Sequence, residues 1–345
     1  MADSKNKILI RAVNWIGDAV MSIPAIKAIR LLYPESHITV LGKPSVLDVL
    51  SLIEDIDDFI LYEISSGDWG FVKRVCLGKL IKEKCFDKCF IFPNSFDSAI
   101  VPFVAGIPER IGFQGCFRAP LLTLKVKRPL PEMHQAEKYF ELVKADGFSG
   151  NMPGFKLKPG LDSLKWSDDF MKFHIRSKEK IVVGVSPGAE YGPAKRWFPD
   201  RFAGLINRLK NVYDAEVVLV GSENDRDVCG SVNRQVSGNI IDMSGKTTIK
   251  QLIALLKKMD LLITNDTGTM HLASALGIPV IAVFGSTDNR ATSPVTGKVK
   301  IVKNDVSCSP CLKRICVKNT YECFSKISVK EVFNEVKNIL DKRKG

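Results

Sequence analysis

An aspartate near the start of the chain is placed where it could act as a general base. Asp18 ends the polar segment 14–18, which lies between an apolar run at residues 7–13 and a helix-like pattern at residues 17–33. A carboxylate in the first turn of a helix can stabilise the helix dipole. It can also accept the proton of a sugar hydroxyl that attacks an anomeric carbon. The sequence alone leaves both roles open for Asp18.

A loop rich in glycine and proline carries two adjacent cations in the second half of the chain. This loop, SPGAEYGPAKRW at residues 186–197, includes Ser186, Gly188, Lys195 and Arg196. Glycine lets the backbone approach a ligand closely, and lysine supplies a compact positive charge that suits a phosphate oxygen. Loop lysines are usually just solvated. Two adjacent cations beside a predicted helix start nevertheless favour contact with a phosphate.

A third polar segment, NDTGTMH at residues 265–271, joins a strongly apolar run to a predicted helix. Backbone N–H groups and hydroxyls at a helix start can bind a diphosphate. A helix cap by an aspartate or threonine fits the same pattern. The histidine falls one turn further in, so we expect it to be packed or capping rather than an acid or base. The candidate donor contacts in this segment are Asp266, Thr267, Gly268, Thr269 and His271.

An acidic residue, Glu223, follows another strand-like run at residues 216–220. An acidic group in this place in a nucleotide-binding domain typically accepts hydrogen bonds from ribose hydroxyls. Neither half of the chain contains G-x-G-x-x-G or G-x-x-x-x-G-K-[ST]. The standard dinucleotide-binding and P-loop interpretations therefore lack support.

Alternating strand-like and helix-like patterns must position these segments. Strands are predicted at residues 7–13, 37–41, 58–61, 88–92, 181–186, 216–220, 261–264 and 279–284. Helices are predicted at 17–33, 200–209, 225–236, 249–258, 269–276 and 329–340. A further amphipathic helix is predicted with Trp69, Val72, Cys76 and Leu80 on its apolar, packed face. The alternation predicts the α/β class, with two Rossmann-like, doubly wound domains that face each other across a cleft at the carboxyl ends of their strands.

The composition sets the domain boundaries and the cellular compartment that we expect. The chain of 345 residues suits two domains, at 1–160 and 177–325, with a polar linker at 161–176. A last helix is expected at 326–345, and packing back on the first domain is one option for it. The sequence has no apolar run near the roughly 18 residues that span a bilayer. It also lacks a secretory signal at its start, so we expect a cytoplasmic protein.

The charge of the chain and its cysteines each leave alternatives open. The net charge is +12, from 50 Lys and Arg against 38 Asp and Glu, and it favours a partner with phosphates or carboxylates. Four of the nine cysteines have the spacing C-x2-C-x4-C-x6-C. This spacing fits either a structural zinc site or a reduced, partly buried loop. The four cysteines are Cys308, Cys311, Cys316 and Cys323.

At these motifs the chain resembles the ADP-heptose glycosyltransferases of lipopolysaccharide core synthesis, glycosyltransferase family 9, and within them the heptosyltransferase II group. The resemblance covers nearly the whole chain. It is carried by residues 14–18 with Pro24, 93–96 with 105–108 and Arg110, 187–190 with 195–197, and 264–268 with His271.

The resemblance implies a metal-independent, inverting enzyme of the two-domain glycosyltransferase B type, with no required cofactor. It implies that the second domain holds ADP-L-glycero-D-manno-heptose and that the first holds a heptosyl-Kdo2-lipid A acceptor. By position, Asp18 resembles the catalytic base, Lys195 the residue that faces the diphosphate and sugar, and Glu223 the ribose contact. The segment at 266–268 resembles the loop at the donor sugar and phosphates.

The acceptor side is expected to use polar and basic residues of the first domain. A lipid acceptor implies peripheral contact with the inner face of the cytoplasmic membrane, and no nucleic acid. Transfer to another heptose position of the core is a related alternative. A non-catalytic binder of nucleic acid or anionic membranes, built on the basic tail at residues 298–345 and the cysteine cluster, is the alternative from another class. The oligomeric state is left open. The acceptor candidates are Asn14, Asn94, Lys73, Arg74, Arg110 and Arg118.

Overall fold

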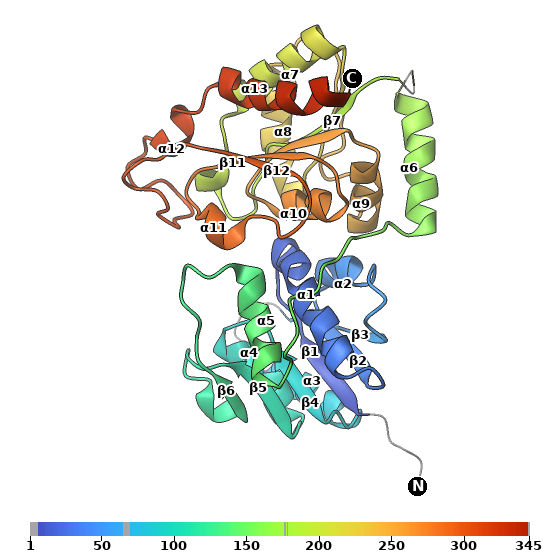
Figure 1. The fold of residues 1–345 in the computed structure, drawn as a ribbon, viewed down its shortest axis with the longest axis vertical. Coiled ribbons are helices and arrows are strands. Elements are labelled where there is room, and N and C mark those ends of the chain that lie inside the picture. The colour runs from blue at the N-terminus through green and yellow to red at the C-terminus, as the bar shows by residue number, and fades with distance from the viewer. Residues whose placement is uncertain (1–5, 65–69, 176, 178, 344–345) are drawn as a thin grey trace. The chain divides into compact units, whose positions relative to one another are not determined.

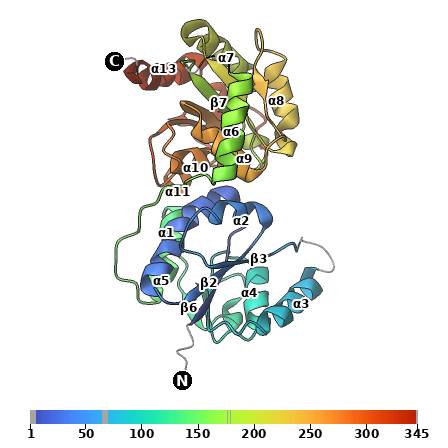
Figure 2. The same cartoon turned by 90° about the vertical axis from the view of Figure 1, so that its right-hand side faces the viewer.

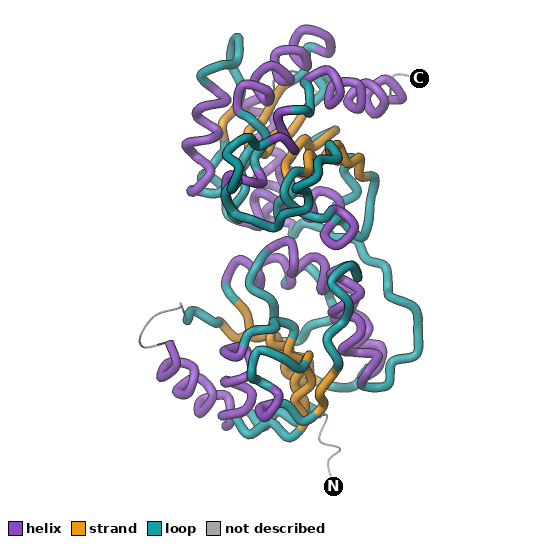
Figure 3. The backbone as a smooth tube through the Cα atoms, turned by 90° about the vertical axis from the view of Figure 1, so that its left-hand side faces the viewer, coloured by secondary structure: helices purple, strands orange, loops and turns teal. Residues whose placement is uncertain are grey.

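A computed structural model describes residues 6–64, 70–175, 177 and 179–343 of the chain. The chain divides into two compact units, Met1–Phe155 and Lys156–Gly345 (Figure 1). Each unit contains one six-stranded sheet in which every pair of neighbouring strands is parallel. Helices and loops surround the strands of each unit (Figure 3). The predicted α/β class with two doubly wound sheets is confirmed.

The sheet of the first unit has the strand order β3-β2-β1-β4-β5-β6. Its central strand β1 buries Ile8, Leu9 and Ile10 completely. An apolar run of this kind is typical of parallel strands that are covered on both faces. The elements of the first unit are β1 (Lys7–Arg11), α1 (Ile16–Leu32), β2 (His37–Gly42), α2 (Pro44–Leu50), β3 (Asp58–Leu61), α3 (Gly70–Lys82), β4 (Lys88–Ile91), α4 (Phe96–Val104), β5 (Glu109–Phe113), η1 (Ala119–Leu121), β6 (Leu124–Val126) and α5 (Gln135–Ala145).

The sheet of the second unit has the order β12-β11-β10-β7-β8-β9. Every residue of β7, β10 and β11 is buried. The elements of the second unit are α6 (Leu161–His174), β7 (Val182–Ser186), η2 (Pro193–Lys195), α7 (Pro199–Tyr213), β8 (Glu216–Leu219), η3 (Glu223–Asp225), α8 (Arg226–Asn233), β9 (Ile241–Asp242), α9 (Ile249–Lys257), β10 (Leu261–Asn265), α10 (Gly268–Ala275), β11 (Val280–Phe284), α11 (Asn289–Thr292), β12 (Val299–Lys303), α12 (Glu322–Ser325), α13 (Val329–Leu340) and η4 (Asp341–Arg343).

Two segments that we expected to lie outside the second domain belong to the second unit. Most of the predicted linker is helix α6, which packs beside α9 (Figure 2). The final helix α13 packs against α7, β11 and β12. Its apolar residues Val332, Phe333 and Val336 join the main core of this unit. The apolar stripe of α13 therefore explains its place, because burial of such a stripe against the nearest core stabilises the helix.

The helix predicted around residues 69–80 forms, but its packed face differs from the expected one. Trp69 lies outside the described residues. Val72, Cys76 and Leu80 are exposed, so the prediction that they pack inward is wrong. Helix α3 instead buries Gly70, Arg74, Gly78 and Ile81. None of the helices in the described ranges combines the length and apolarity needed to cross a bilayer.

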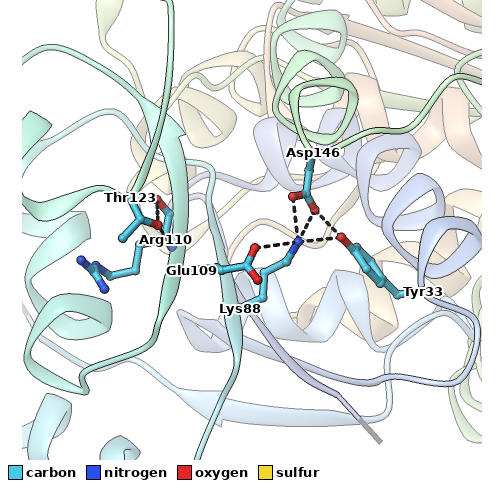
Figure 4. A network of polar contacts seen from close by, with 6 residues as sticks. All are labelled: Tyr33, Lys88, Glu109, Arg110, Thr123 and Asp146. Carbon is cyan, nitrogen blue, oxygen red and sulfur yellow. Dashed lines mark hydrogen bonds and ion pairs between the residues drawn. The ribbon is translucent and has the colours of Figure 1, made fainter.

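A polar network fastens the first sheet at the amino ends of its strands (Figure 4). Lys88, the first residue of β4, contacts both carboxylate oxygens of Asp146 at 2.7 and 2.8 Å. It also lies 2.6 Å from the Tyr33 hydroxyl and 3.0 Å from Glu109. Burial opposes the charge on Lys88, but these partners outweigh burial and raise its pKa above the ordinary lysine value. The network holds the ends of α1 and α5 to the sheet edge opposite the polar motifs.

Candidate functional site

In each unit, the polar motifs follow the two strands at which the strand order reverses. In the first unit these strands are β1 and β4, which pair with each other. In the second unit they are β7 and β10, which also pair. The carboxyl ends of strands at such a switch point are the usual ligand site of an open α/β sheet. The topology therefore gives each unit one candidate site, built from two motif loops.

In the second unit, the buried side chain of Asn265 ties the two motif loops together. Its Nδ2 donates to the carbonyl oxygens of Pro187 and Gly188 at 2.8 and 3.3 Å. Its Oδ1 accepts a hydrogen bond from the backbone N–H of Trp197 at 3.0 Å. A buried amide with these partners fixes the course of the loop that carries Lys195.

A lysine and an aspartate from the two loops meet at this switch point. Lys195 Nζ lies 2.6 Å from Asp266 Oδ2. The same oxygen accepts a hydrogen bond from the Thr287 hydroxyl at 2.7 Å. Lys195 Nζ also lies 5.0 Å from the centre of the Tyr191 ring, within range of a cation–π interaction. The lysine charge is thus held at one place beside the start of α10.

The start of α10 offers backbone donors at the same place. Thr267 is the N-cap of this helix, and its hydroxyl lies 3.2 Å from the hydroxyl of Thr264. The N–H groups of a helix's first turn have no partners within the helix, and they attract anions. Gly268 and Thr269 supply such groups here. His271 is buried one turn further along the helix.

The remaining donor candidates shape the loop after β7. A Cβ atom on Gly188 would come within 2.1 Å of the Asp225 carboxylate, so this position requires glycine. Asp225 accepts hydrogen bonds from the backbone N–H and hydroxyl of Ser222 at 3.0 and 2.7 Å. Arg196 donates to the Ala189 carbonyl at 3.1 Å, which braces the loop.

Two further donor candidates lie at the ends of strands. Ser186 is the buried last residue of β7. Glu223 follows β8 on the surface, where it forms an ion pair with Arg226 at 2.9 Å. A carboxylate in this exposed place after a strand remains accessible to a ribose.

In the first unit, a tyrosine from α5 holds the candidate base. The hydroxyl of Tyr139 donates to Asp18 Oδ1 at 3.1 Å. Burial, followed by the charge of Asp18, holds the pKa of Tyr139 well above the ordinary tyrosine value. Tyr139 therefore stays protonated at neutral pH and remains a hydrogen-bond donor. Asp18 itself lies in the first turn of α1 and is partly exposed.

Buried arginines support the other loops of the first unit. Arg11 donates to Asn14 Oδ1 at 3.3 Å, and its guanidinium lies 4.0 Å from the centre of the Tyr62 ring. Arg118 has no exposed surface and donates to the carbonyl oxygens of Phe113 and Pro93. It also reaches Asn94 Oδ1 at 3.4 Å. Burial lowers the pKa of Arg118 to about 10.

These contacts change the roles that we expect for the basic acceptor candidates. Arg118 is enclosed in the core, where it contacts Asn94. Arg74 is buried and forms an ion pair with Asp97 at 3.0 Å. Arg110 donates to the backbone carbonyl oxygens of Leu121 and Ile107, on either side of it in the chain. Lys73 is exposed on α3.

The sequence did not reveal several residues that hold the two sites. Tyr139 lies on α5, a helix that the sequence analysis did not predict. Thr287 comes three residues after β11, so the rule that ligands bind at carboxyl ends could have indicated it. Tyr191 lies in the loop at residues 186–197, and its residue type gave no role to predict. Its contact with Lys195 depends on how the loop folds back.

The cysteine-rich loop packs onto the loop that carries Lys195. The backbone N–H of Ala194 donates to the Arg314 carbonyl at 3.0 Å, and the Tyr191 hydroxyl donates to the Leu312 carbonyl at 2.7 Å. Burial and the three neighbouring cysteines raise the pKa of Cys323 to about 11. Across the described ranges, no group of three or more His, Cys, Asp or Glu residues is arranged to hold a metal ion.

Comparisons with known proteins place the chain in one family of glycosyltransferases. The family model described as glycosyltransferase family 9 (heptosyltransferase) matches residues 74–322. Lipopolysaccharide heptosyltransferase 2 of Escherichia coli K12 is 31% identical over 309 residues, which cover 86% of this chain and 88% of that protein.

Solved structures agree over almost the full length. The structure of E. coli ADP-heptose lps heptosyltransferase II superposes with a TM-score of 0.83 and 27% identity, and covers 98% of this chain and 100% of that one. The glycosyl transferase family 9 structure from Veillonella parvula has a TM-score of 0.89 at 21% identity, with 99% of each chain covered. The second likeness supports the fold alone.

Proposed function

This chain belongs to glycosyltransferase family 9, the heptosyltransferases, and on that premise we propose that it transfers L-glycero-D-manno-heptose from ADP-heptose to the heptosyl-Kdo2-lipid A inner core of lipopolysaccharide. The second unit, Lys156–Gly345, holds the donor, and the first unit, Met1–Phe155, holds the acceptor. The observation that carries the proposal is the pairing of Lys195 with Asp266 beside the start of α10, at the switch point of the second sheet.

The second unit stabilises the charge that develops on the leaving group. When the bond between the heptose C1 and the diphosphate breaks, negative charge builds on ADP. Lys195 and the N–H groups of Gly268 and Thr269 supply positive charge and donors where that charge forms. These groups are fixed before the reaction by Asn265 and Asp266, so little reorganisation is needed. The enzyme's own residues can thus do the work that a bound metal does in other transferases, and Glu223 binds the ribose hydroxyls.

The first unit removes the proton of the attacking hydroxyl. The acceptor oxygen attacks C1 from the side opposite to ADP, its proton passes to a carboxylate oxygen of Asp18, and the C1–O bond to ADP breaks. The product therefore has inverted configuration at C1. Tyr139 donates a hydrogen bond to one carboxylate oxygen of Asp18.

The acceptor carries phosphates and carboxylates, and the polar residues of the first unit suit these groups. Asn14 and Asn94 lie in the two loops of its switch point, where Arg11 and Arg118 orient them. Lys73 offers an exposed cation. Because the acceptor is a lipid, the enzyme works in the cytoplasm at the inner face of the membrane and needs no nucleic acid.

The proposal is tested by incubating the purified chain with ADP-heptose and a set of truncated cores. ADP release and the mass of the lipid product show whether and where a heptose is added. Asp18→Asn should lower kcat by about 10²-fold or more, the usual contribution of a general base. Its affinity for ADP should stay unchanged, because Asp18 lies in the first unit.

Asp200→Asn is the matched control, since Asp200 also lies in the first turn of a helix, α7. It should keep the turnover of the unaltered enzyme. Turnover of Asp18→Asn equal to that of the control would remove Asp18 from the role of base. Absence of a heptosylated product with every core would refute the proposed function itself.

A further inference from the structure

Helix α3 of the first unit packs with the opposite polarity to an ordinary surface helix. A surface helix normally buries its apolar stripe and exposes its charges. The buried positions of α3 are Gly70, Arg74, Gly78 and Ile81, of which only one is a large apolar residue. Ile81 and Leu77 pack on the core, so it is the exposed apolar side chains of this helix that need another explanation.

The buried face of α3 is shaped for close contact with α4. A Cβ atom on Gly78 would lie 2.7 Å from the Cβ atom of Val104, so glycine permits this approach. The guanidinium of Arg74 donates to the Tyr62 hydroxyl at 3.0 Å and forms an ion pair with Asp97. These contacts fix which side of α3 faces outward.

The outward side of α3 is apolar along its length. Val72, Cys76 and Leu80 are four residues apart, so they form one row on the helix surface. Leu80 is 65% exposed. Beside this row, Leu61 is 57% exposed and lines the same shallow groove as Leu80.

Lysines border this apolar row. Lys73, Lys79 and Lys82 are exposed on the same helix. An exposed apolar face with lysines at its borders is the pattern of a helix that lies in the interface of a bilayer, where apolar side chains enter the lipid and cations meet anionic headgroups. Glu63 is the acidic residue that lines the groove. The three cations of the helix outnumber it.

We propose that the outer face of α3, made of Leu61, Val72, Cys76 and Leu80 with Lys79 and Lys82, docks on the surface of a bilayer that contains anionic phospholipids. The inference deepens the proposed function, because a lipid-linked acceptor must be reached at such a surface. A lysine can extend its aliphatic stem along the apolar face while its ammonium group reaches a phosphate. A second copy of this chain, with its net charge of +12, would meet this border of cations with like charge.

Binding of the full chain to lipid vesicles tests this proposal without donor or acceptor. Co-sedimentation is measured with vesicles of phosphatidylglycerol and phosphatidylethanolamine, and with vesicles of phosphatidylcholine alone. We expect binding to the anionic vesicles and at least about tenfold weaker binding to the neutral ones. Val72→Ser with Leu80→Ser should weaken binding to the anionic vesicles by about tenfold or more, because both side chains then lose their apolar contact with lipid.

Charge and fold are controlled with separate variants. Lys79→Glu with Lys82→Glu should weaken binding to anionic vesicles and leave the weak binding to neutral vesicles unchanged. Leu161→Ser with Phe173→Ser is the matched apolar control, since both residues are exposed on α6 of the second unit, and it should bind like the unaltered chain. Circular dichroism and the urea denaturation midpoint should be the same in all variants, which shows that each one folds.

Three results would overturn the proposal. The first is equal vesicle binding by the α3 serine variant and by the unaltered chain. The second is equal loss in the α6 control. The third is a dimer in vesicle-free solution that the α3 serine variant abolishes, which would make this face a contact between copies. Vesicle binding through α3 together with absent heptose transfer would leave this inference standing and refute the proposed function alone.

Discussion

The loops at the two switch points are held in different ways. In the second unit, the motifs hold each other: Asn265 of one loop bonds to Pro187 and Gly188 of the other, and Asp266 meets Lys195. In the first unit, side chains from outside the motifs hold the loops. The main examples are Tyr139 on Asp18, Arg11 on Asn14 and Arg118 on Asn94.

This difference predicts how each site responds to mutation. The supports of the first unit are part of its core, so their loss should lower the stability of the fold as well as disturb the site. The Lys195 and Asp266 pair is largely buried, with 14% and 5% of the side chains exposed, and it lies where we propose that the donor binds, so its loss should lower both ADP affinity and stability. The comparison would be wrong if loss of a first-unit support lowered ADP affinity while loss of Lys195 left that affinity unchanged.

The largest expected effect is on stability, from Arg118→Met. Methionine has a similar length and leaves the buried carbonyl oxygens of Phe113 and Pro93 without their charged donor. We expect the free energy of unfolding to fall by about 2–4 kcal/mol, as for loss of charged hydrogen bonds in a core. Urea denaturation measures this change.

Arg128→Met is the matched control, because Arg128 is exposed in the same unit. It should leave the denaturation midpoint within about 0.5 kcal/mol of the unaltered chain. ADP affinity should not change in either variant. An Arg118→Met chain as stable as the control would show that the first site is not supported through its core.

The sequence predicted the elements whose apolar residues follow a regular strand or helix pattern. The bounds of β3 and α13 agree with the prediction to the residue. The edge strands β6 and β12 were missed, because lysines interrupt their apolar residues and an edge needs only one covered side. Helix α4 was missed because Pro102 breaks its pattern.

The sequence also predicted one part of each candidate site and missed another. The motif loops of both units lie at carboxyl ends of strands, which a sequence of alternating elements can indicate. The supports do not follow from local pattern, since Tyr139 and Asp18 are 121 residues apart and meet only because α1 packs on α5. Arginine is usually found at the surface of a protein, and only the folded chain shows that Arg118 is buried. The face of α3 was misjudged for a related reason, because glycine and a paired arginine can form a packed surface.

The next largest effect is on the donor, from Lys195→Ala. Removal of a charged hydrogen bond to a phosphate should weaken ADP binding by about 1.5–3 kcal/mol, or roughly 10- to 150-fold in Kd. Stability should fall as well, because the buried Asp266 loses its cation. Calorimetry measures the affinity, and Lys172→Ala, at an exposed lysine of α6, is the control. An unchanged affinity for ADP in Lys195→Ala would count against the lysine as a phosphate ligand.

The smallest effect is expected from Tyr139→Phe, which removes one hydroxyl and keeps the ring in its place against Phe92. Loss of one hydrogen bond to Asp18 amounts to about 0.5–1.5 kcal/mol, so kcat should fall by roughly 2- to 12-fold. Tyr213→Phe is a matched control, because the Tyr213 hydroxyl also donates to an aspartate, Asp341, at 2.7 Å in the other unit. It should leave kcat unchanged.

A double variant that combines Tyr139→Phe with Asp18→Asn distinguishes a structural role of Tyr139 from a positioning role. If the tyrosine acts through Asp18, then Tyr139→Phe should lower kcat little further once Asp18→Asn is present, because the base that it orients is already lost. Independent, additive losses would mean that Tyr139 supports the packing of α5 and not the base. In that case the first site would be held by its buried arginines alone, and the contrast between the two units would rest on Arg11 and Arg118.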